Sequence, residues 1–376
     1  MRRPRKKFRM SCTGEAKNPS GKVPLFANVT RLLHDWIDSV KNPAVWFPAI
    51  RTGTGTDVFT ERLVAGLQAR GLRAEITWLP PRAEYAPRAV AIPKPPEWVD
   101  VCHVNTWLHP RFIPKKLPVV ATLHHSIHDP VLRPHKGWLR AAYHRWWIAP
   151  IERRVLRRAN MVVAVSRFVA DMAWFTLCDV PMQVIYNGID TEQFHPGKRV
   201  RRSGEPFRLL YVGGWMVRKG VDMLPAVMRE LGEGFELHYT GGSAADKDKP
   251  GMPATMHDLG RLSGKRVIAA MQDADAFLFP SRSEGLPLVV IEAMACGLPV
   301  IGTAGTAVAE VVADGETGLL CRGDDIVCFA RAIRRLAADA SLGERMRIAS
   351  RHRATNDFSF DAMVRDYIHQ YCQLVK

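Results

Sequence analysis

Two glutamates, eight residues apart, have the most specific spacing for chemistry in this 376-residue sequence. A helix is expected over about 287–296, because Pro287 suits a first helical turn and Gly297 a left-handed C-terminal position. Glu284 then lies in the loop before this helix, and Glu292 lies among apolar residues inside it. An ionised carboxylate in apolar surroundings needs hydrogen-bond donors. The sequence therefore predicts a polar partner for Glu292.

Nucleotide binding is the chemistry that fits this pair. Ribose hydroxyls are suitable donors to Glu292, and the free N–H groups of Gly285 and Leu286 at the helix start suit a diphosphate. Two structural alternatives stay open at this point. Glu292 could pair with a basic side chain in the core, and Glu284 could be an ordinary helix cap.

Alternating strand and helix patterns predict the elements that position these residues. Apolar runs separated by helical stretches are typical of doubly wound α/β domains with parallel sheets. A polar stretch over 187–206 divides the alternation, so a second α/β domain is expected to begin near Phe207. The predicted strands cover 44–50, 74–79, 99–104, 119–123, 161–165 and 183–185, then 208–212, 235–239, 276–280, 299–302 and 318–321.

Longer motifs resemble a known family. The Glu284/Glu292 pair, its flanks "PSRSEGLPLVVIEAMACGLPVIGT" and the later "EVVADGETGLL" are similar to the signature of the retaining glycosyltransferases of family 4, the glycosyl transferases group 1. Further resemblance lies in "TGTGTDVFTERLVAGLQARG", "VVATLHH", "RRANMVVAVS", "VIYNGIDTEQFHP" and "LLYVGGWMVRKGVDML".

The resemblance implies a GT-B fold, in which two Rossmann-like domains face an interdomain cleft. It predicts an acceptor domain over 44–196, a nucleotide-sugar domain over 207–355, and a C-terminal segment over 356–376 whose helix crosses back to the first domain. Residues 1–43, a basic and amphipathic extension, have no counterpart in the family pattern.

The resemblance also implies roles for single residues on the donor side. Glu292 resembles the carboxylate that binds the ribose, Glu284 the one near the donor sugar, and Lys219 the lysine that binds the diphosphate. The chain departs from the family at Gly214, where an arginine often stands. Arg218, next to Lys219, is the candidate replacement.

On the acceptor side, His124 follows the predicted strand 119–123 and by analogy contacts the donor sugar or the acceptor. The alternative is a loop histidine that is hydrogen-bonded within the protein and has no functional role. His125 and His128 fit that interpretation. The loop Gly53, Thr54 and Gly55 would let backbone approach an acceptor or a phosphate closely, although a plain tight turn explains it nearly as well.

A departing nucleoside diphosphate gains negative charge, which Lys219 and helix amides would stabilise. The prediction is therefore a metal-independent hexosyltransferase without a cofactor. Two D-x-D pairs, Asp246/Asp248 and Asp273/Asp275, are the possible metal ligands, but neither follows a predicted strand.

The net charge of +16 is confined to one half of the chain: residues 1–200 hold 31 Lys and Arg against 15 Asp and Glu, whereas residues 201–376 hold 22 of each. The aromatic and basic stretch 136–158 and an amphipathic helix near 25–40 indicate an anionic membrane surface as partner. The alternatives are a solvated basic face and a core-packed helix. No nucleic-acid partner is expected, because no RNA-binding motif occurs.

Seven scattered cysteines without a C-x-x-C pair indicate a reducing compartment. The basic start of the chain is not followed by the apolar segment of a secretion signal. We therefore expect a cytoplasmic protein, peripheral on the inner face of the membrane.

Together these features predict a transferase that moves a sugar from a nucleotide-diphosphate sugar to a membrane-associated glycan or lipid-linked acceptor, as in polysaccharide or lipopolysaccharide biosynthesis. Two alternatives remain: a non-catalytic GT-B scaffold or binding protein, motivated by Gly214, and a sugar-nucleotide epimerase of the same fold.

Overall fold

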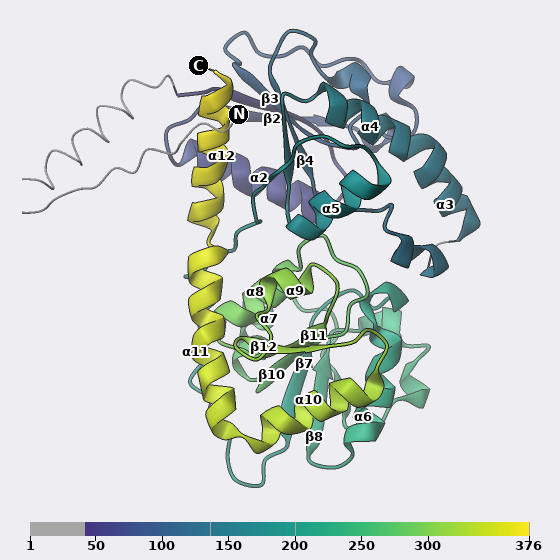
Figure 1. Cartoon of the computed structure of the whole chain (residues 1–376), viewed down its shortest axis with the longest axis vertical. Helices are drawn as coiled ribbons and strands as arrows, with labels where there is room; N and C mark the ends of the chain where they lie inside the picture. The colour runs from purple at the N-terminus through teal and green to yellow at the C-terminus, as the bar shows by residue number, and fades with distance from the viewer. Residues whose placement is uncertain (1–41, 136, 200, 376) are drawn as a thin grey trace, which may run out of the picture. The chain divides into compact units, whose positions relative to one another are not determined.

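The computed structural model describes residues 42–135, 137–199 and 201–375 (Figure 1). The predicted helix near 25–40 and Lys136 lie outside these residues, as does nearly all of the extension 1–43. No helix among the described residues is both long and apolar enough to cross a bilayer. None of the six cysteines among the described residues forms a disulfide.

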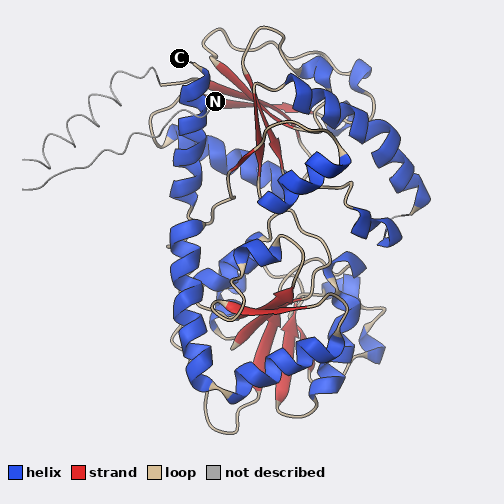
Figure 2. Cartoon of the chain, viewed as in Figure 1, coloured by secondary structure: helices blue, strands red, loops and turns tan. Residues whose placement is uncertain are grey.

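Two six-stranded sheets form the framework, and every strand pair in them is parallel (Figure 2). The first sheet has the order β2-β1-β3-β4-β5-β6. Its strands are β1 (Val45–Ile50), β2 (Ala74–Leu79), β3 (Val101–Asn105), β4 (Val119–Leu123), β5 (Met161–Ala164) and β6 (Gln183–Val184). The second has the order β12-β11-β10-β7-β8-β9 and comprises β7 (Phe207–Tyr211), β8 (Phe235–Tyr239), β9 (Met256–Asp258), β10 (Ala276–Phe279), β11 (Val300–Thr303) and β12 (Gly318–Cys321).

Helices connect the strands and cover the sheets. In the first half they are α2 (Gly55–Gln68), α3 (Trp138–Tyr143), α4 (Ala149–Arg158) and α5 (Arg167–Thr176). In the second half they are α6 (Leu224–Leu231), α7 (Lys265–Gln272), α8 (Leu288–Ala295), α9 (Val308–Val311), α10 (Ile326–Ala338), α11 (Ala340–Asp357) and α12 (Phe360–Leu374).

Burial on both faces explains why the strands read as continuous apolar runs. Along β1, Val45 and Phe47 pack into one hydrophobic cluster with α2 and α12, while Trp46 and Ile50 pack into another with α4. Parallel sheets covered on both faces have this pattern. The predicted pair of doubly wound domains is thus confirmed, with most strand ends within two residues of expectation.

Three details differ from the sequence-based expectation. Strand β9 was not predicted, because it is short and two of its three residues are polar. Helix α8 begins at Leu288, one residue after the expected start, and Pro287 takes the position before its first turn. The sequence pattern predicts a helix over 222–231, whereas helix α6 begins at Leu224, since residues Val221–Met223 form a separate 3₁₀ turn.

A buried polar chain ties the C-terminal helix α12 to the first sheet. The hydroxyl of Tyr371 lies 2.6 Å from Nδ1 of His103 on β3, whose Nε2 lies 2.7 Å from the hydroxyl of Thr122 on β4. Tyr367 reaches the same Thr122 hydroxyl at 3.2 Å. Burial lowers the pKa of His103 to about 3, so its ring is neutral and uses each nitrogen once.

Removing the Tyr371 hydroxyl should therefore destabilise the fold. Tyr371→Phe leaves a ring nitrogen of His103 buried without its partner, which costs about 1–3 kcal/mol. The matched control Tyr367→Phe should cost less, because Thr122 keeps its bond to His103. Urea unfolding measures both. Equal stability of the wild type and the Tyr371 variant would contradict the anchoring role of this chain.

Candidate active site

Two loops at neighbouring strand ends build the centre of the site. Strands β7 and β10 are parallel neighbours, so their carboxyl ends lie at one edge of the sheet. The 3₁₀ turn Val217–Lys219 lies beyond β7, and the loop 280–287 follows β10. The loops are close enough that a Cβ on Gly220 would lie 2.1 Å from the carbonyl oxygen of Pro280. Gly220 has no Cβ, so it permits this close approach, and a glycine also tolerates the φ of +72° found here.

An arginine that sequence reasoning did not select holds the two loops together. Arg282 donates to both carboxylate oxygens of Asp222, at 2.7 and 2.9 Å, and to Asp324 at 2.8 Å. It also donates to the carbonyl oxygen of Val217. Its backbone N–H bonds the carbonyl oxygen of Arg218 at 3.0 Å. This clamp fixes the turn that carries Arg218 and Lys219.

The structure brings two predicted residues, Lys219 and Glu284, into direct contact. The Lys219 Nζ lies 2.6 Å from Oε1 of Glu284, and the hydroxyl of Ser281 donates to the same oxygen at 2.5 Å. Glu284 is buried, with 7% of its surface exposed. A buried carboxylate needs such partners. Ser281 was missed, although it stands three residues before Glu284 in the same loop.

The start of α8 offers backbone donors beside this pair. Among the described residues, no hydrogen-bond partner is found for the N–H groups of Gly285 or Leu286. They stand in the loop that leads into α8, where the helix dipole favours negative charge.

Arg218 reaches a cavity of about 720 Å³ that residues of both halves line. Its Nη1 donates to the carbonyl oxygen of Ser283 at 2.8 Å, which leaves further guanidinium N–H groups for a ligand. Gly214 does not supply a side chain there, and its carbonyl oxygen accepts from the hydroxyl of Tyr211 at 3.0 Å.

Glu292 stands apart from the other carboxylates. It lies in α8, half-buried, and no hydrogen bond to its side chain is found among the described residues. Burial raises its pKa to about 7, and the charge of Arg62 on α2 opposes this rise only in part. The alternative of a hydrogen-bonded basic partner in the core is therefore not found among the described residues, and the carboxylate is available to a ligand.

His124 is held as a neutral ring on the first half. Its Nε2 lies 3.0 Å from Oδ1 of Asn105, and the Phe59 ring packs edge-on at 4.5 Å. Burial lowers the pKa of His124 to about 4, so it carries no charge near neutral pH. His128 is also satisfied, because its Nε2 lies 2.8 Å from Oε2 of the buried Glu152.

The loop of Gly53, Thr54 and Gly55 is closed by a buried carboxylate. Asp57 accepts the N–H groups of Thr52 at 2.9 Å and Gly53 at 2.7 Å. These are N–H groups that a phosphate would otherwise use, and a fixed negative charge beside them disfavours an anion. The role of this loop at an acceptor or a phosphate stays a prediction. Asp57 was readable in "TGTGTD" but was not selected.

A cavity of about 530 Å³ with both apolar and polar lining adjoins this loop and His124. Its wall includes the threonines of the loop and two carboxylates that sequence reasoning missed. Glu84 accepts from the hydroxyl of Tyr143 at 2.9 Å, and Glu152 from the hydroxyl of Thr106 at 3.0 Å. Hydroxyl and carboxylate groups of this kind suit a ligand rich in hydroxyls.

The aromatic and basic stretch 136–158 divides into packed and exposed parts. Trp147 and Tyr143 donate to Glu84, so they belong to the structure of the first half. Trp138 and Trp146 are 77% and 72% exposed, as is Phe175 of α5 at 69%.

The candidate D-x-D carboxylates are engaged by neighbouring side chains. Asp246 pairs with Lys249 at 2.7 Å, and Asp248 accepts from the indole of Trp215 at 2.8 Å. Asp273 and Asp275 pair with Arg199 at 3.4 and 3.5 Å.

Comparisons with known proteins agree with this arrangement. The pattern of the Glycosyl transferases group 1 matches residues 206–339, and that of Glycosyltransferase Family 4 matches residues 79–193. The chain belongs to glycosyltransferase family 4. The first match covers the half that carries Lys219, Glu284 and Glu292, and the second covers the half that carries His124.

Relatives and solved structures extend the likeness over most of this family 4 chain. Glycogen synthase from Mycobacterium tuberculosis (strain CDC 1551 / Oshkosh) is 28% identical over 315 residues, which span 80% of this chain and 70% of that protein. Sucrose-phosphate synthase from Thermosynechococcus elongatus superposes with a TM-score of 0.72 at 20% identity, over 88% of this chain and 99% of that one. Anabaena HepE, solved with UDP, gives 0.67 at 15% identity, over 87% and 99%. The GT-B fold is thereby confirmed.

The two glutamates should respond differently to neutral substitution. Glu284→Gln removes the charge beside Lys219 and should chiefly lower turnover, whereas Glu292→Gln should chiefly weaken binding of the nucleotide sugar. Steady-state kinetics and calorimetric titration separate the two effects, with the exposed Glu316→Gln as control. Equal and small effects of both substitutions would contradict the assignment.

Nucleotide-sugar binding should also depend on the ionisation of Glu292. In its predicted role, Glu292 would accept hydrogen bonds from ribose hydroxyls through its ionised carboxylate, whose fraction rises as the pH passes its pKa of about 7. Affinity should therefore increase about fivefold to tenfold between about pH 6 and pH 8. In Glu292→Gln this dependence should disappear; if it persists, another group is responsible.

Proposed function

We propose that this family 4 chain is a retaining, metal-independent glycosyltransferase that moves a sugar from a nucleotide-diphosphate sugar to a membrane-associated glycan or lipid-linked acceptor. The observation that carries the proposal is the Lys219 to Glu284 contact of 2.6 Å beside the start of α8. The UDP bound to HepE, which has the same fold, supports a nucleotide-sugar donor.

The proposed donor site places positive charge where the leaving group gains negative charge. The Lys219 ammonium has three N–H groups and uses one of them to bind Glu284, which holds it in place. The other two remain for phosphate oxygens. The N–H groups of Gly285 and Leu286 add donors from the backbone. Groups that are fixed before the reaction need no reorganisation during it, so they stabilise the transition state effectively.

The proposed acceptor site is the cavity of about 530 Å³ on the first half. Neutral His124 borders it and serves as a hydrogen-bonding group, because its low pKa excludes a charged role at neutral pH. Its threonine and carboxylate lining favours an acceptor that presents hydroxyl groups. In this proposal, Glu292 binds the ribose and Arg218 assists Lys219 at the diphosphate.

Loss of Lys219 should impair transfer strongly. Lys219→Ala removes the fixed cation at the leaving group and should lower turnover on the order of 100-fold. The exposed Lys265→Ala is the matched control and should retain activity. Slow release of nucleotide from donor sugars, measured without acceptor, provides the assay and separates a transferase from a non-catalytic scaffold. Wild-type turnover in Lys219→Ala would contradict the proposed role.

The proposed mechanism also predicts that transfer survives a chelator. Activity should be assayed in excess chelator well below the unfolding temperature. Loss of a stabilising metal then does not lower activity by unfolding the protein. Loss of activity that magnesium or manganese restores would overturn metal independence. Retention at the sugar carbon is tested by nuclear magnetic resonance of the first product, since an inverted anomer would exclude it.

The proposed membrane contact lies on the first half. Trp146 and Phe175 line a cavity of about 870 Å³ together with Arg133, Arg145 and Arg153. Exposed aromatic rings beside arginines suit the interface of an anionic bilayer, where each basic residue contributes about 1 kcal/mol. The net positive charge of residues 1–200 also favours an anionic surface.

Vesicle binding tests this contact. The full chain should co-sediment with vesicles that contain phosphatidylserine at low salt and should dissociate at about 1 M salt, where the Debye length falls to about 3 Å. Trp146→Ser with Phe175→Ser should weaken binding several-fold, while the exposed Ile348→Ser of α11 should not. Equal binding to neutral vesicles, or none to anionic ones, would refute membrane docking and leave the transferase assignment intact.

A further inference from the structure

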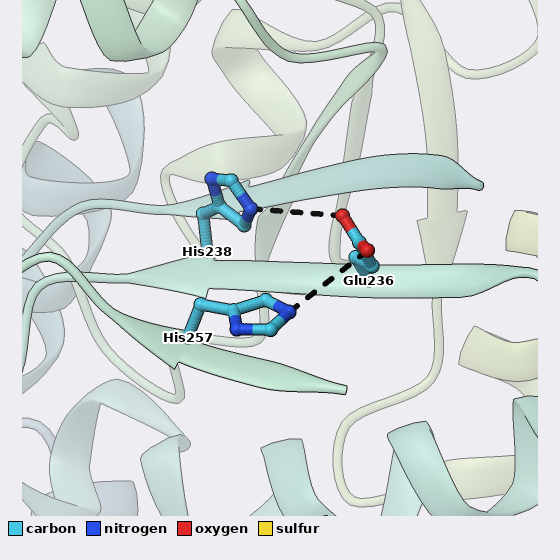
Figure 3. A group of neighbouring side chains, drawn as sticks. All are labelled: Glu236, His238 and His257. Carbon is cyan, nitrogen blue, oxygen red and sulfur yellow. Dashed lines mark ion pairs between the residues drawn. The ribbon is translucent and has the colours of Figure 1, made fainter. Parts of the chain in front are cut away.

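Three potential metal ligands lie together on the outer strands of the second sheet, outside the proposed active site. Strands β8 and β9 are parallel neighbours, and their register places His238 directly opposite His257. Glu236 stands two residues before His238 on β8, so the two side chains share a face of the sheet. Figure 3 shows both histidine rings next to the carboxylate of Glu236, joined to it by dashed lines.

The distances within this group are short enough for a shared ion. The carboxylate of Glu236 lies 3.7 Å from Nε2 of His238 and 4.0 Å from Nε2 of His257 (Figure 3). One ligand atom from each residue lies within 4.8 Å of the others. A tetrahedral ion with bonds of about 2.0–2.2 Å separates its ligand atoms by somewhat less, so small rotations of the side chains would complete the site.

Solvent can reach the group, and one arginine lies beside it. The side chains of Glu236, His238 and His257 are 28%, 22% and 45% exposed. Nε of Arg208 on β7 lies 3.8 Å from Oε2 of Glu236, within ion-pair distance but too far for a hydrogen bond. Arg208 also pairs with Asp273. This carboxylate offsets the positive charge of Arg208 and so weakens its repulsion of a bound cation.

We propose that Glu236, His238 and His257 form a binding site for a borderline divalent transition metal ion, with zinc as the principal candidate. Two imidazole nitrogens and one carboxylate suit zinc and its neighbours, whereas magnesium and calcium prefer oxygen ligands throughout. Three protein ligands leave a fourth position for water. Among the described residues, this is the one such group of three close enough to share an ion.

The site has a structural consequence for the edge of the sheet. Strand β9 is the outermost strand, and it ends at Asp258, whose Oδ1 accepts the N–H groups of Gly241, Gly242 and Gly260 at 2.8–3.1 Å. An ion bound to ligands on both β8 and β9 would fasten this strand to the sheet. It would thereby hold the loops that Asp258 organises, without taking part in glycosyl transfer.

Zinc titration of the purified full chain in competition with a metallochromic chelator tests the proposal. We expect one equivalent to bind, and a rise in the unfolding temperature with zinc but not with magnesium. The double variant His238→Gln with His257→Gln should lose at least about tenfold in affinity. The matched control His369→Gln, an exposed histidine of α12, should bind as the wild type does.

Glu236→Gln provides a second variant of nearly unchanged shape, in case the double variant fails to fold. It should also weaken zinc binding, and cobalt bound to the wild type should show tetrahedral visible absorption that both variants reduce. Zinc affinity unchanged in either variant, or equal stabilisation by magnesium, would overturn the proposal. Because none of these measurements uses transferase activity, their outcome is independent of the proposed function.

Discussion

A carbonyl oxygen on the first half of the chain occupies the space that any side chain at residue 285 would need. A Cβ on Gly285 would lie 2.0 Å from the oxygen of His124. The carbonyl oxygen of Gly285 accepts from the hydroxyl of Ser166 at 2.6 Å, and Ser283 donates to the buried Asp129 at 3.2 Å. The loop before α8 is therefore held by the other half of the chain, and the positions of the residues around it depend on this contact.

Burial makes the pairing of Glu284 obligatory, and this pairing organises the electrostatics of the site. A carboxylate with 7% exposure would be costly without Lys219 and Ser281, so the ammonium is fixed before any ligand arrives. Glu292 has the opposite character, since it is half-buried without a described partner and its pKa rises to about 7. Glu284 thus stabilises the internal structure of the site, whereas Glu292 still lacks hydrogen-bond donors among the described residues.

Regular features of the chain were predictable, and contacts distant in sequence were not. Apolar runs buried on both faces of a parallel sheet mark their own strands, and the spacing of Glu284 and Glu292 placed both around α8. The pairing of Lys219 with Glu284 joins residues 65 positions apart. It depends on the adjacency of β7 and β10, which periodicity does not reveal. Strand β9 escaped prediction for a local reason, because three residues are too few for a pattern.

Gly214 stands where the family often has an arginine, and Arg218 lies four residues further along the chain. The carbonyl oxygen of Gly214 is bound by the Tyr211 hydroxyl, and the Met216 methyl lies 3.2 Å from where a Cβ would stand. Arg218 lines the cavity instead and uses one of its five N–H groups on Ser283. In the proposed donor site, the Arg218 guanidinium would supply the positive charge that an arginine at position 214 supplies in the family pattern. The loss of an arginine at one backbone position is therefore weak evidence against a diphosphate site.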